Sequence, residues 1–437
     1  MILASVLALT ACRPTEGLPL SDEVFSAIEL TLSANMATVV SVDWLAEVEA
    51  DVRVLSWEEG GEVLTSPWSG LTTTNSMTIL GHHQLAEVSV QLETAEGHLS
   101  EVQTITTGFV DASLPGLTVV SSGDLEPGYL VVPLLAEEGG GLGSPGVAIL
   151  DREGYVWAQP KPEVLLLSSA SLSPDRTAMW AMGGATMQGW SRDGVVLEEF
   201  LVDEAHHDFL FLPDGTIAAV STRTFSDTAF TDGIIERAPD GTTTTVFDLS
   251  EHLDDLGIDT NTGNTGSPDL THANSLAYDA DRDAYLLNLA TLPMVLSVDR
   301  ATGDIQWVIH GAGEVGLSFS PPSPYTITHQ ITVIDGGYLQ FVNLTEDSEC
   351  SRVVEIAVDA ANGTAEEVAE YGLESCITVF GLGGVQRLDN GNTLIIWSTG
   401  GLIEEYDPSG AVVWSVEADF GSGFGYGRWM ESIDVVP

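Results

Sequence analysis

A degenerate repeat of short hairpins constrains the fold of this 437-residue chain more than any other feature. One half of the repeat reads strand, turn, strand. It is seen at 207–217, where Leu-Pro-Asp-Gly separates two apolar runs, and again at 386–394, where Leu-Asp-Asn-Gly does so. Asp-Gly and Asn-Gly are strong hairpin signals, because a type I′ turn needs positive φ at its central residues. The sequence therefore predicts tight hairpins at both places.

The other half of the repeat is a hairpin that begins with Asp, contains Gly and closes on an aromatic residue. It occurs at 150–157, 298–307 and 406–414. Two such hairpins make one four-stranded blade, and blades repeated around an axis form a β-propeller, which hides most strand edges. The spacing predicts about six blades, which begin near positions 128, 164, 206, 272, 329 and 383. We expect Ile433–Val436 to be the closing strand of the first blade.

A different pattern precedes the repeat. From residue 31 to residue 107 apolar and polar residues alternate in short runs, as at 37–44 and 86–92, with turn residues about every eight to twelve positions. This pattern is typical of a small antiparallel β-sandwich and resembles a fibronectin type III-like module. We therefore expect an all-β chain with a signal segment at 1–12, a sandwich at 25–112 and a propeller at 122–437.

The chain is strongly acidic: 13 basic against 65 acidic side chains give a formal net charge of -52. Such a charge repels nucleic acid and anionic membrane surfaces, and it suits solubility in a saline or crowded exterior. The acidic loop at 279–283 is an alternative calcium ligand set, but it lacks the ligand spacing of an EF-hand loop.

Residues 1–12 are mostly apolar and end at Cys12, the pattern that precedes a lipid-modified cysteine in bacterial lipoproteins. They are too few to span a bilayer, so a lipid on Cys12 is the only membrane contact expected, in an exported periplasmic or outer-membrane-anchored protein. A frayed apolar N-terminus is the alternative. Cys350 and Cys376 then remain as a pair, either a disulfide or two buried free thiols. The sequence leaves the oligomeric state open.

Three histidines fall at equivalent phases of the repeat: His207, His272 and His329 each stand at the beginning of the first strand of a blade. In a propeller, the innermost strands begin at the central channel, so these side chains are predicted to share one space. A single histidine of this kind is more often structural. Three at the same phase favour a ligand site.

The ordered set of motifs in residues 125–437 resembles the bacterial arylsulfotransferase family. The motifs are His-Asp followed by Leu-Pro-Asp-Gly at 207–215, Thr-His-Ala-Asn-Ser at 271–275, Val-Asp-Arg-x-Thr-Gly-x-Ile-x-Trp at 298–307, Ser-Arg-Val-Val-Glu at 351–355, and 386–394 with Thr-Gly-Gly at 399–401.

The resemblance implies a ping-pong enzyme that moves a sulfuryl group from a small phenolic sulfate to a phenol through a sulfohistidine. It implies His329 as the nucleophile, His207 and His272 around the sulfuryl oxygens, and Asn274 as an accompanying amide. Neutral imidazole is a good nucleophile near neutral pH, and protonated imidazoles and amides stabilise charge that develops on oxygen. The resemblance implies no metal and no nucleotide cofactor.

The sequence departs from this family at one position. Family members usually carry an arginine in the strand before the Val-Asp-Arg turn, and Ala290 stands there. A guanidinium suits sulfate oxygens, and alanine supplies none of it. Arg352 and Arg387 are candidate substitutes, and His206 is a further source of charge.

Two other functions remain open from the sequence. The missing arginine favours a catalytically inactive propeller that binds a ligand or partner at the cell surface. Convergent histidines with Asp208 also fit a metal site, since imidazole suits zinc and copper.

Overall fold

The computed structural model describes residues 24–434 except 124, 139–140, 161–165, 203, 227–228, 259, 261–267, 291, 293, 311–314, 321–324, 346–347 and 374–375. Cys12 and the end of the expected closing strand, at 435–436, therefore lie outside the described residues. The chain forms two compact units. One comprises Met1–Val110, Arg192–Gly194 and Ile433–Pro437, and the other comprises Asp111–Ser191 and Val195–Ser432.

Almost all regular structure in the described residues is β-strand, apart from two single turns of 3₁₀ helix, η1 (Leu249–Glu251) and η2 (Ser398–Gly400). Within these residues no helix has the length and apolar character needed to cross a bilayer.

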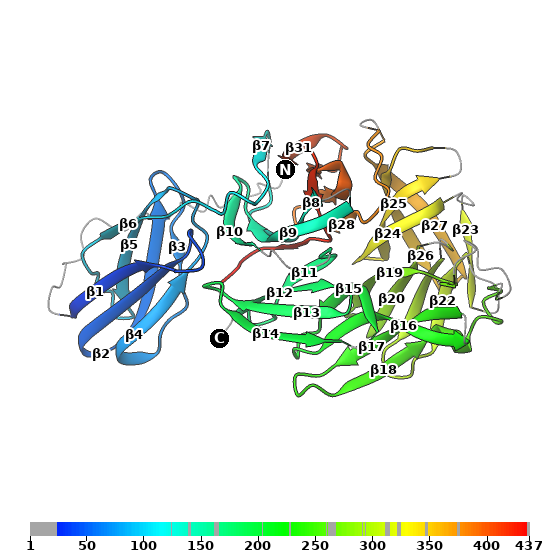
Figure 1. The fold of residues 1–437 in the computed structure, drawn as a ribbon, viewed down its shortest axis with the longest axis horizontal. Helices are drawn as coiled ribbons and strands as arrows, with labels where there is room; N and C mark the ends of the chain where they lie inside the picture. The colour runs from blue at the N-terminus through cyan, green and yellow to red at the C-terminus, as the bar shows by residue number, and fades with distance from the viewer. Residues whose placement is uncertain are drawn as a thin grey trace, which may run out of the picture. The chain divides into compact units, whose positions relative to one another are not determined.

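The first unit is an antiparallel β-sandwich built around one long strand (Figure 1). Its strands are β1 (Phe25–Leu32), β2 (Val40–Glu58), β3 (Leu64–Thr65), β4 (Leu71–Ile79), β5 (Glu87–Thr94) and β6 (Gln103–Thr106). The first half of β2 pairs with β1 and β4, and its second half pairs with β3 and β5. Alternate residues such as Val42, Val52 and Val90 are buried in the core between the sheets, as period-two patterning requires.

The second unit is an all-β propeller, which confirms the predicted fold class. In the described residues its strands group into six blades. Blade 1 contains β8 (Tyr129–Glu138), β9 (Gly141–Leu150) and β10 (Tyr155–Pro160). Blade 2 contains β11 (Ser169–Leu172), β12 (Ala178–Gly183), β13 (Thr186–Ser191) and β14 (Val196–Leu201). Blade 3 contains β15 (Ala205–Phe211), β16 (Ile217–Ser226), β17 (Ala229–Arg237) and β18 (Thr243–Asp248).

Blades 4 to 6 follow in chain order. Blade 4 contains β19 (Ala273–Asp279), β20 (Ala284–Leu289), β21 (Met294–Asp299) and β22 (Ile305–Ile309). Blade 5 contains β24 (Tyr325–Ile334), β25 (Gly337–Thr345), β26 (Arg352–Asp359) and β27 (Thr364–Tyr371). Blade 6 contains β28 (Gly384–Arg387), β29 (Thr393–Ile396), β30 (Leu402–Tyr406) and β31 (Val412–Ala418).

Segments from both ends of this unit close the ring. β7 (Leu117–Ser121) pairs with β31 as an extra outer strand of blade 6. β32 (Ser422–Phe424) and β33 (Arg428–Met430) pair with β8 and complete blade 1. The expected closing strand at Ile433–Val436 is therefore wrong in position, because 422–430 already occupy the free edge of β8 and Ile433 lies outside any strand.

Blades 4 and 5 are joined at their outer edges by β23 (Gly316–Ser320). This strand pairs in parallel with β22 on one side and with β27 on the other. It covers two edges that would otherwise be unpaired, and it makes one nine-stranded sheet of the two blades.

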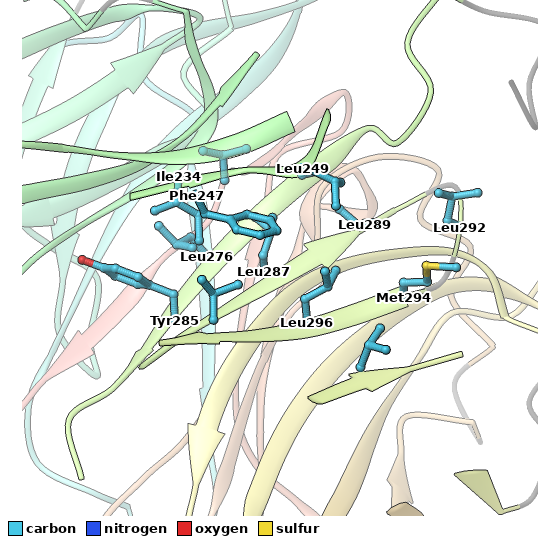
Figure 2. Close-up of a cluster of buried hydrophobic side chains, with 14 of the residues drawn as sticks. Ile234, Phe247, Leu249, Leu276, Tyr285, Leu287, Leu289, Leu292, Met294 and Leu296 are labelled. Carbon is cyan, nitrogen blue, oxygen red and sulfur yellow. The ribbon is translucent and has the colours of Figure 1, made fainter. Parts of the chain in front are cut away.

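The hydrophobic cores lie between neighbouring blades. Figure 2 shows the cluster between blades 3 and 4, where Phe247 of β18 packs near Leu276 of β19 and Leu287 of β20. All three side chains are almost fully buried. Apolar faces on both sides of each blade explain why the strands of this unit read as short apolar runs instead of strict alternation.

The predicted hairpins form, but their turn type differs from the prediction. Gly215 and Gly391 have positive φ (85° and 89°), whereas Asp214 and Asn390 are not among the non-glycine residues with positive φ. The Asp214 and Asn390 side chains instead accept the amide two residues ahead, from Thr216 and Asn392. These are type I turns followed by a left-handed glycine, not type I′ turns.

A disulfide joins Cys350 and Cys376, which is the first of the two alternatives that the sequence left open. The residues that follow each cysteine are also linked, because the Ser351 N–H donates to the Ile377 carbonyl at 2.8 Å. The start of β26 and the loop before β28 are therefore held together.

Candidate functional site

A cavity of about 510 Å³ opens on the inner strands of the propeller. The three predicted histidines, His207, His272 and His329, all line it, and so does His206. The His207 and His272 rings meet edge to face with centroids 5.0 Å apart. The other lining residues are Leu166, Ser168, Gly184, Ala290, Ile327, Phe380, Gly381 and Leu382.

Irregular backbone aims the three histidines inward. The pairing register of the innermost strand shifts between Ala205 and Phe209 in β15, and between Thr328 and Ile331 in β24. His207 and His272 have positive φ, 61° and 48°, an uncommon conformation outside glycine. Bulges and strained residues of this kind re-aim side chains and cluster at functional sites.

The environment of His329 fixes which of its nitrogens carries the proton. His329 Nδ1 lies 2.5 Å from Asn343 Oδ1. The Asn343 amide nitrogen donates to the carbonyls of Val379 at 2.9 Å and Leu382 at 2.8 Å, so its oxygen faces the histidine. An amide oxygen only accepts, so His329 Nδ1 must carry a hydrogen. Nε2 of a neutral His329 is then left with a free lone pair.

Burial keeps His329 neutral. Only 7 % of the residue is exposed. Burial lowers the pKa of His329 to about 4, the hydrogen bond to Asn343 opposes the shift, and the charge of His272 adds to it. Burial, followed by the charges of His206, His272 and His329, also holds the pKa of His207 well below its usual value.

His272 has the opposite electrostatic environment. Its Nδ1 lies 2.6 Å from Asp269 Oδ2, and its backbone N–H donates to Asp269 Oδ1 at 2.9 Å. The hydrogen bond to Asp269 raises the pKa of His272, although burial opposes it. The cavity thus contains a neutral imidazole and a second imidazole that favours the charged form.

His206 links His207 to a buried carboxylate. Its Nε2 lies 3.0 Å from Asp232 Oδ1, and its Nδ1 lies 2.7 Å from Nδ1 of His207. Asp232 is 1 % exposed. His206 was expected only as a source of charge, and no sequence motif indicated Asp232, which lies on β17.

Asn274 does not line the cavity. Its amide nitrogen donates to the carbonyl of Thr328 at 2.8 Å, and its oxygen accepts from Asn288 at 2.9 Å. Asn288 in turn donates to the carbonyl of His329 at 3.0 Å. The Asn274 nitrogen is thus bonded to the backbone beside His329, and its oxygen is bonded to the Asn288 side chain, which contacts the same segment.

Asp208 lies beneath the histidines and joins several blades. It is fully buried and accepts from Ser169 Oγ (2.8 Å), the Phe209 amide (2.9 Å), the Leu276 amide (3.2 Å) and Arg428 Nη2 (2.9 Å). Burial raises the pKa of Asp208, and the Arg428 guanidinium opposes this. Its contacts are those of a structural centre and leave it no role as a ligand in the cavity.

Ala290 lines the cavity, and its backbone N–H donates to the His272 carbonyl at 2.9 Å. Among the described residues of the lining there is no Arg or Lys. Neither candidate substitute reaches the lining: Arg352 pairs with Glu370 at 2.9 Å, and Arg387 pairs with Glu355. Any positive charge in the described lining must therefore come from histidine.

Residues 145–320 match the family model described as arylsulfotransferase (ASST). Over this segment the chain is similar to the arylsulfotransferase family. It includes His207, His272 and Ala290, whereas His329 lies beyond it. The match supports the family resemblance that the histidine motifs indicated.

No curated protein matches the chain. Similar solved structures include a Bacteroides caccae protein of unknown function (16% identity, 70% of this chain and 100% of that one, TM-score 0.47). Another match is virginiamycin B lyase of Staphylococcus aureus (11% identity, 72% of this chain and 99% of that one, TM-score 0.41). A third is the β-propeller domain of Myceliophteria thermophila Cps50 (Swd1) (12% identity, 72% of this chain and 90% of that one, TM-score 0.39). Likenesses of this size indicate nothing about activity.

Among the described residues no group of three or more His, Cys, Asp or Glu has an arrangement suited to a metal ion. Nδ1 of each of the three histidines, and the carboxylate of Asp208, which the sequence offered as alternative ligands, contact protein partners as described above.

Proposed function

We propose that the chain is a sulfuryl transferase that takes the group from a phenolic sulfate and gives it to a phenol, with His329 as the nucleophile. The observation that carries the proposal is the contact between His329 Nδ1 and Asn343 Oδ1 at 2.5 Å. With Nδ1 protonated and the ring neutral, the Nε2 lone pair is available to attack the sulfur atom.

In the first half-reaction His329 Nε2 bonds to sulfur and the bond from sulfur to the aryl oxygen breaks. The phenoxide takes a proton and leaves as the phenol. In the second half-reaction an acceptor phenol attacks the same sulfur, loses its proton, and the bond from nitrogen to sulfur breaks. The proton lost by the acceptor phenol replaces the one taken up by the phenoxide, and His329 returns to its neutral form, so the cycle is balanced with no other co-reactant.

His272 is the group best suited to stabilise charge on the sulfuryl oxygens, because Asp269 favours its protonated form. The apolar wall of the cavity, which includes Ile327, Phe380 and Leu382, suits an aryl ring. Asn274, expected as a direct ligand, is proposed here to act only through the backbone of Thr328.

The test is release of nitrophenol from 4-nitrophenyl sulfate by the purified chain, with and without added phenol. We expect release that depends on phenol and is lost in His329→Ala. His98→Ala, in the sandwich unit, is the matched histidine control and should retain full activity. A sulfuryl group retained on His329 when phenol is withheld, detected by mass spectrometry at neutral pH, would identify the intermediate.

A binding propeller without catalysis is the second candidate, and the Ala290 side of the cavity favours it because no guanidinium is present in the described lining. For that candidate, aryl sulfates bind without release of phenol, and His329→Ala changes only the affinity. Calorimetry with 4-nitrophenyl sulfate, run beside the release assay, separates the two candidates.

We also propose that the protein works outside the cytoplasm. The Cys350–Cys376 disulfide supports this location, since disulfides persist in oxidising compartments. Fractionation of cells that express the full chain, with alkylation of free thiols, tests it: the proposal requires the chain outside the cytoplasm with both cysteines protected.

A further inference from the structure

Three side chains form a line from the protein interior to the cavity. Asp232 contacts His206, His206 contacts His207, and the two histidines line the cavity. The carboxylate of Asp232 is almost fully buried and is surrounded by donors. Its Oδ2 accepts from Thr271 Oγ1 and from the Ala273 N–H, the latter at 2.7 Å.

These donors fix the orientation of His206. Oδ2 of Asp232 already accepts two hydrogen bonds, and Oδ1 faces Nε2 of His206. A carboxylate oxygen only accepts, so Nε2 of His206 must carry a hydrogen and donate it to Oδ1. His206 therefore turns Nδ1 toward His207. A buried carboxylate beside an imidazole stabilises the charged form of the imidazole.

The contact between Nδ1 of His206 and Nδ1 of His207, at 2.7 Å, requires one hydrogen and one lone pair between the nitrogens. In one state His206 is protonated on both nitrogens and donates to His207, which then carries its hydrogen on Nε2. In the other state His207 donates from Nδ1, and its Nε2 bears a lone pair. The states differ by one proton, and they exchange when His207 Nε2 gives or takes it.

We propose that Asp232, His206 and His207 form a proton relay, in which His207 Nε2 is the general acid for the departing phenoxide and the general base for the acceptor phenol. The relay rests on the proposed sulfuryl transfer. It assigns His206 and Asp232, which the sequence motifs do not include, as positioning residues that act through His207.

The proton moves are balanced over the two half-reactions. As the bond from sulfur to the aryl oxygen breaks, His207 Nε2–H protonates the phenoxide and the His206 Nδ1 hydrogen passes to His207 Nδ1. When the acceptor phenol attacks the sulfohistidine, its proton goes to His207 Nε2 and the shared hydrogen returns to His206. The relay begins and ends each cycle in the same state.

The relay also places a positive charge on the lining of the cavity, where Ala290 stands in place of an arginine. In the resting state the protonated His206 lies at the cavity wall, on the same lining as Ala290. Asp232 keeps this charge paired in the interior. The charge is consumed when the phenoxide is neutralised, which an arginine cannot do because it does not lose its proton.

A comparison of donors distinguishes a relay from a structural role. A poor leaving group needs a general acid, whereas 4-nitrophenoxide leaves without one. With phenyl sulfate as donor, Asp232→Asn and His206→Gln should each lower kcat/KM for the donor, which reports only the first half-reaction, by about 100-fold, and with 4-nitrophenyl sulfate by less than about 10-fold. Glu58→Gln, which removes a carboxylate from His82 and His83 in the sandwich unit, is the matched control. Equal losses with both donors overturn the relay.

Nitrogen NMR of the wild-type chain with labelled histidine tests the relay without any turnover. The expected spectrum at neutral pH contains the signal of an imidazole protonated on both nitrogens that is lost in His206→Gln, and it shows His207 protonated on Nε2. A neutral His206, or His207 with a bare Nε2, overturns the proposal. If wild type transfers no sulfuryl group to any phenol while the spectrum is as expected, the proposed function fails and the hydrogen-bonded chain alone stands.

Discussion

Asn343 presents its side-chain oxygen to Nδ1 of His329 at 2.5 Å, while the carbonyls of Val379 and Leu382 hold its amide nitrogen. One asparagine thus orients the imidazole and secures the loop that carries Phe380. The amide cannot rotate to present its nitrogen to the histidine without losing both carbonyl contacts.

Replacing Asn343 should therefore impair chemistry more than binding. Asn343→Ala leaves His329 free to carry its hydrogen on either nitrogen, and we expect kcat for 4-nitrophenyl sulfate to fall by about 10- to 100-fold with little change in KM. Ser351→Ala is the matched variant, because Ser351 Oγ accepts from the Val379 amide in the same loop and donates to the backbone carbonyl of Asn343, without contacting His329. A larger loss in Ser351→Ala than in Asn343→Ala would show that loop position matters and histidine orientation does not.

The pH dependence should reflect the burial of His329, the proposed nucleophile. His329 loses its lone pair when it is protonated, and its pKa is lowered to about 4, chiefly by burial. As pH falls, kcat/KM should hold through pH 6.5 and decline only as the pH nears 4. Rates with 4-nitrophenyl sulfate, measured from pH 3.5 upward at constant ionic strength, check this. A decline centred near 6.5 would mean that the nucleophile is exposed or is another group.

Activity should be lost on the alkaline side as His272 loses its proton. Its pKa lies above 6.5, first because of the Asp269 hydrogen bond. Asp269→Asn removes that carboxylate, so the alkaline limb should shift to lower pH while the acid limb remains. An unchanged alkaline limb in this variant would remove His272 from the charge-stabilising role.

Restoring a guanidinium at position 290 should strengthen donor binding. Ala290 lines the cavity, so an arginine there can approach sulfate oxygens, and bidentate pairs of this kind are strong. We expect Ala290→Arg to lower KM for 4-nitrophenyl sulfate by about 10-fold, and Ala290→Leu, which adds bulk without charge, to raise it. If both variants behave alike, the cavity is limited by space.

The ring closure should depend on one buried ion pair. Arg152 in blade 1 contacts Glu405 in blade 6 at 2.5 Å and stacks over Trp429 at 3.9 Å. Arg152→Ala leaves the buried Glu405 unpaired, and the free energy of unfolding should fall by about 3 kcal/mol. Adding Glu405→Gln should recover part of the loss, as urea titration can show. Additive losses in the double variant would mean that the pair is not coupled.

The sequence predicted the features that depend on local residue patterns, which are the hairpins and the shared position of the histidines. The hairpins follow from turn residues such as Asp214 and Gly215, and the meeting of the histidines follows from their equal phase in a propeller. The turn type was wrong because side-chain bonds from Asp214 and Asn390 compete with the type I′ geometry. The closing strand was placed a few residues late because residues 422–430 contain glycines that disguise two short strands.

The parts of the site that escaped prediction depend on contacts between blades. Asn343 sits in the apolar strand β25, and Asp232 sits in the middle of β17; both are nearly fully buried. A polar residue inside an apolar run is a usable signal, but its partner comes from another hairpin and has no fixed spacing. Asn274 shows the converse, since its motif position is close to the histidines while its amide faces the backbone.

The contact between Asp208 and Arg428 joins residues that are synthesised at different times. Asp208 lies at the centre of the propeller unit, yet its guanidinium partner comes from β33, one of the last strands in the described residues. During synthesis every histidine of the cavity precedes the residue that neutralises the carboxylate beneath them. A nascent chain that stops short of residue 422 thus has all its reactive imidazoles but an open ring and an unpaired buried charge. Chemical competence would therefore arrive as a late event in biogenesis.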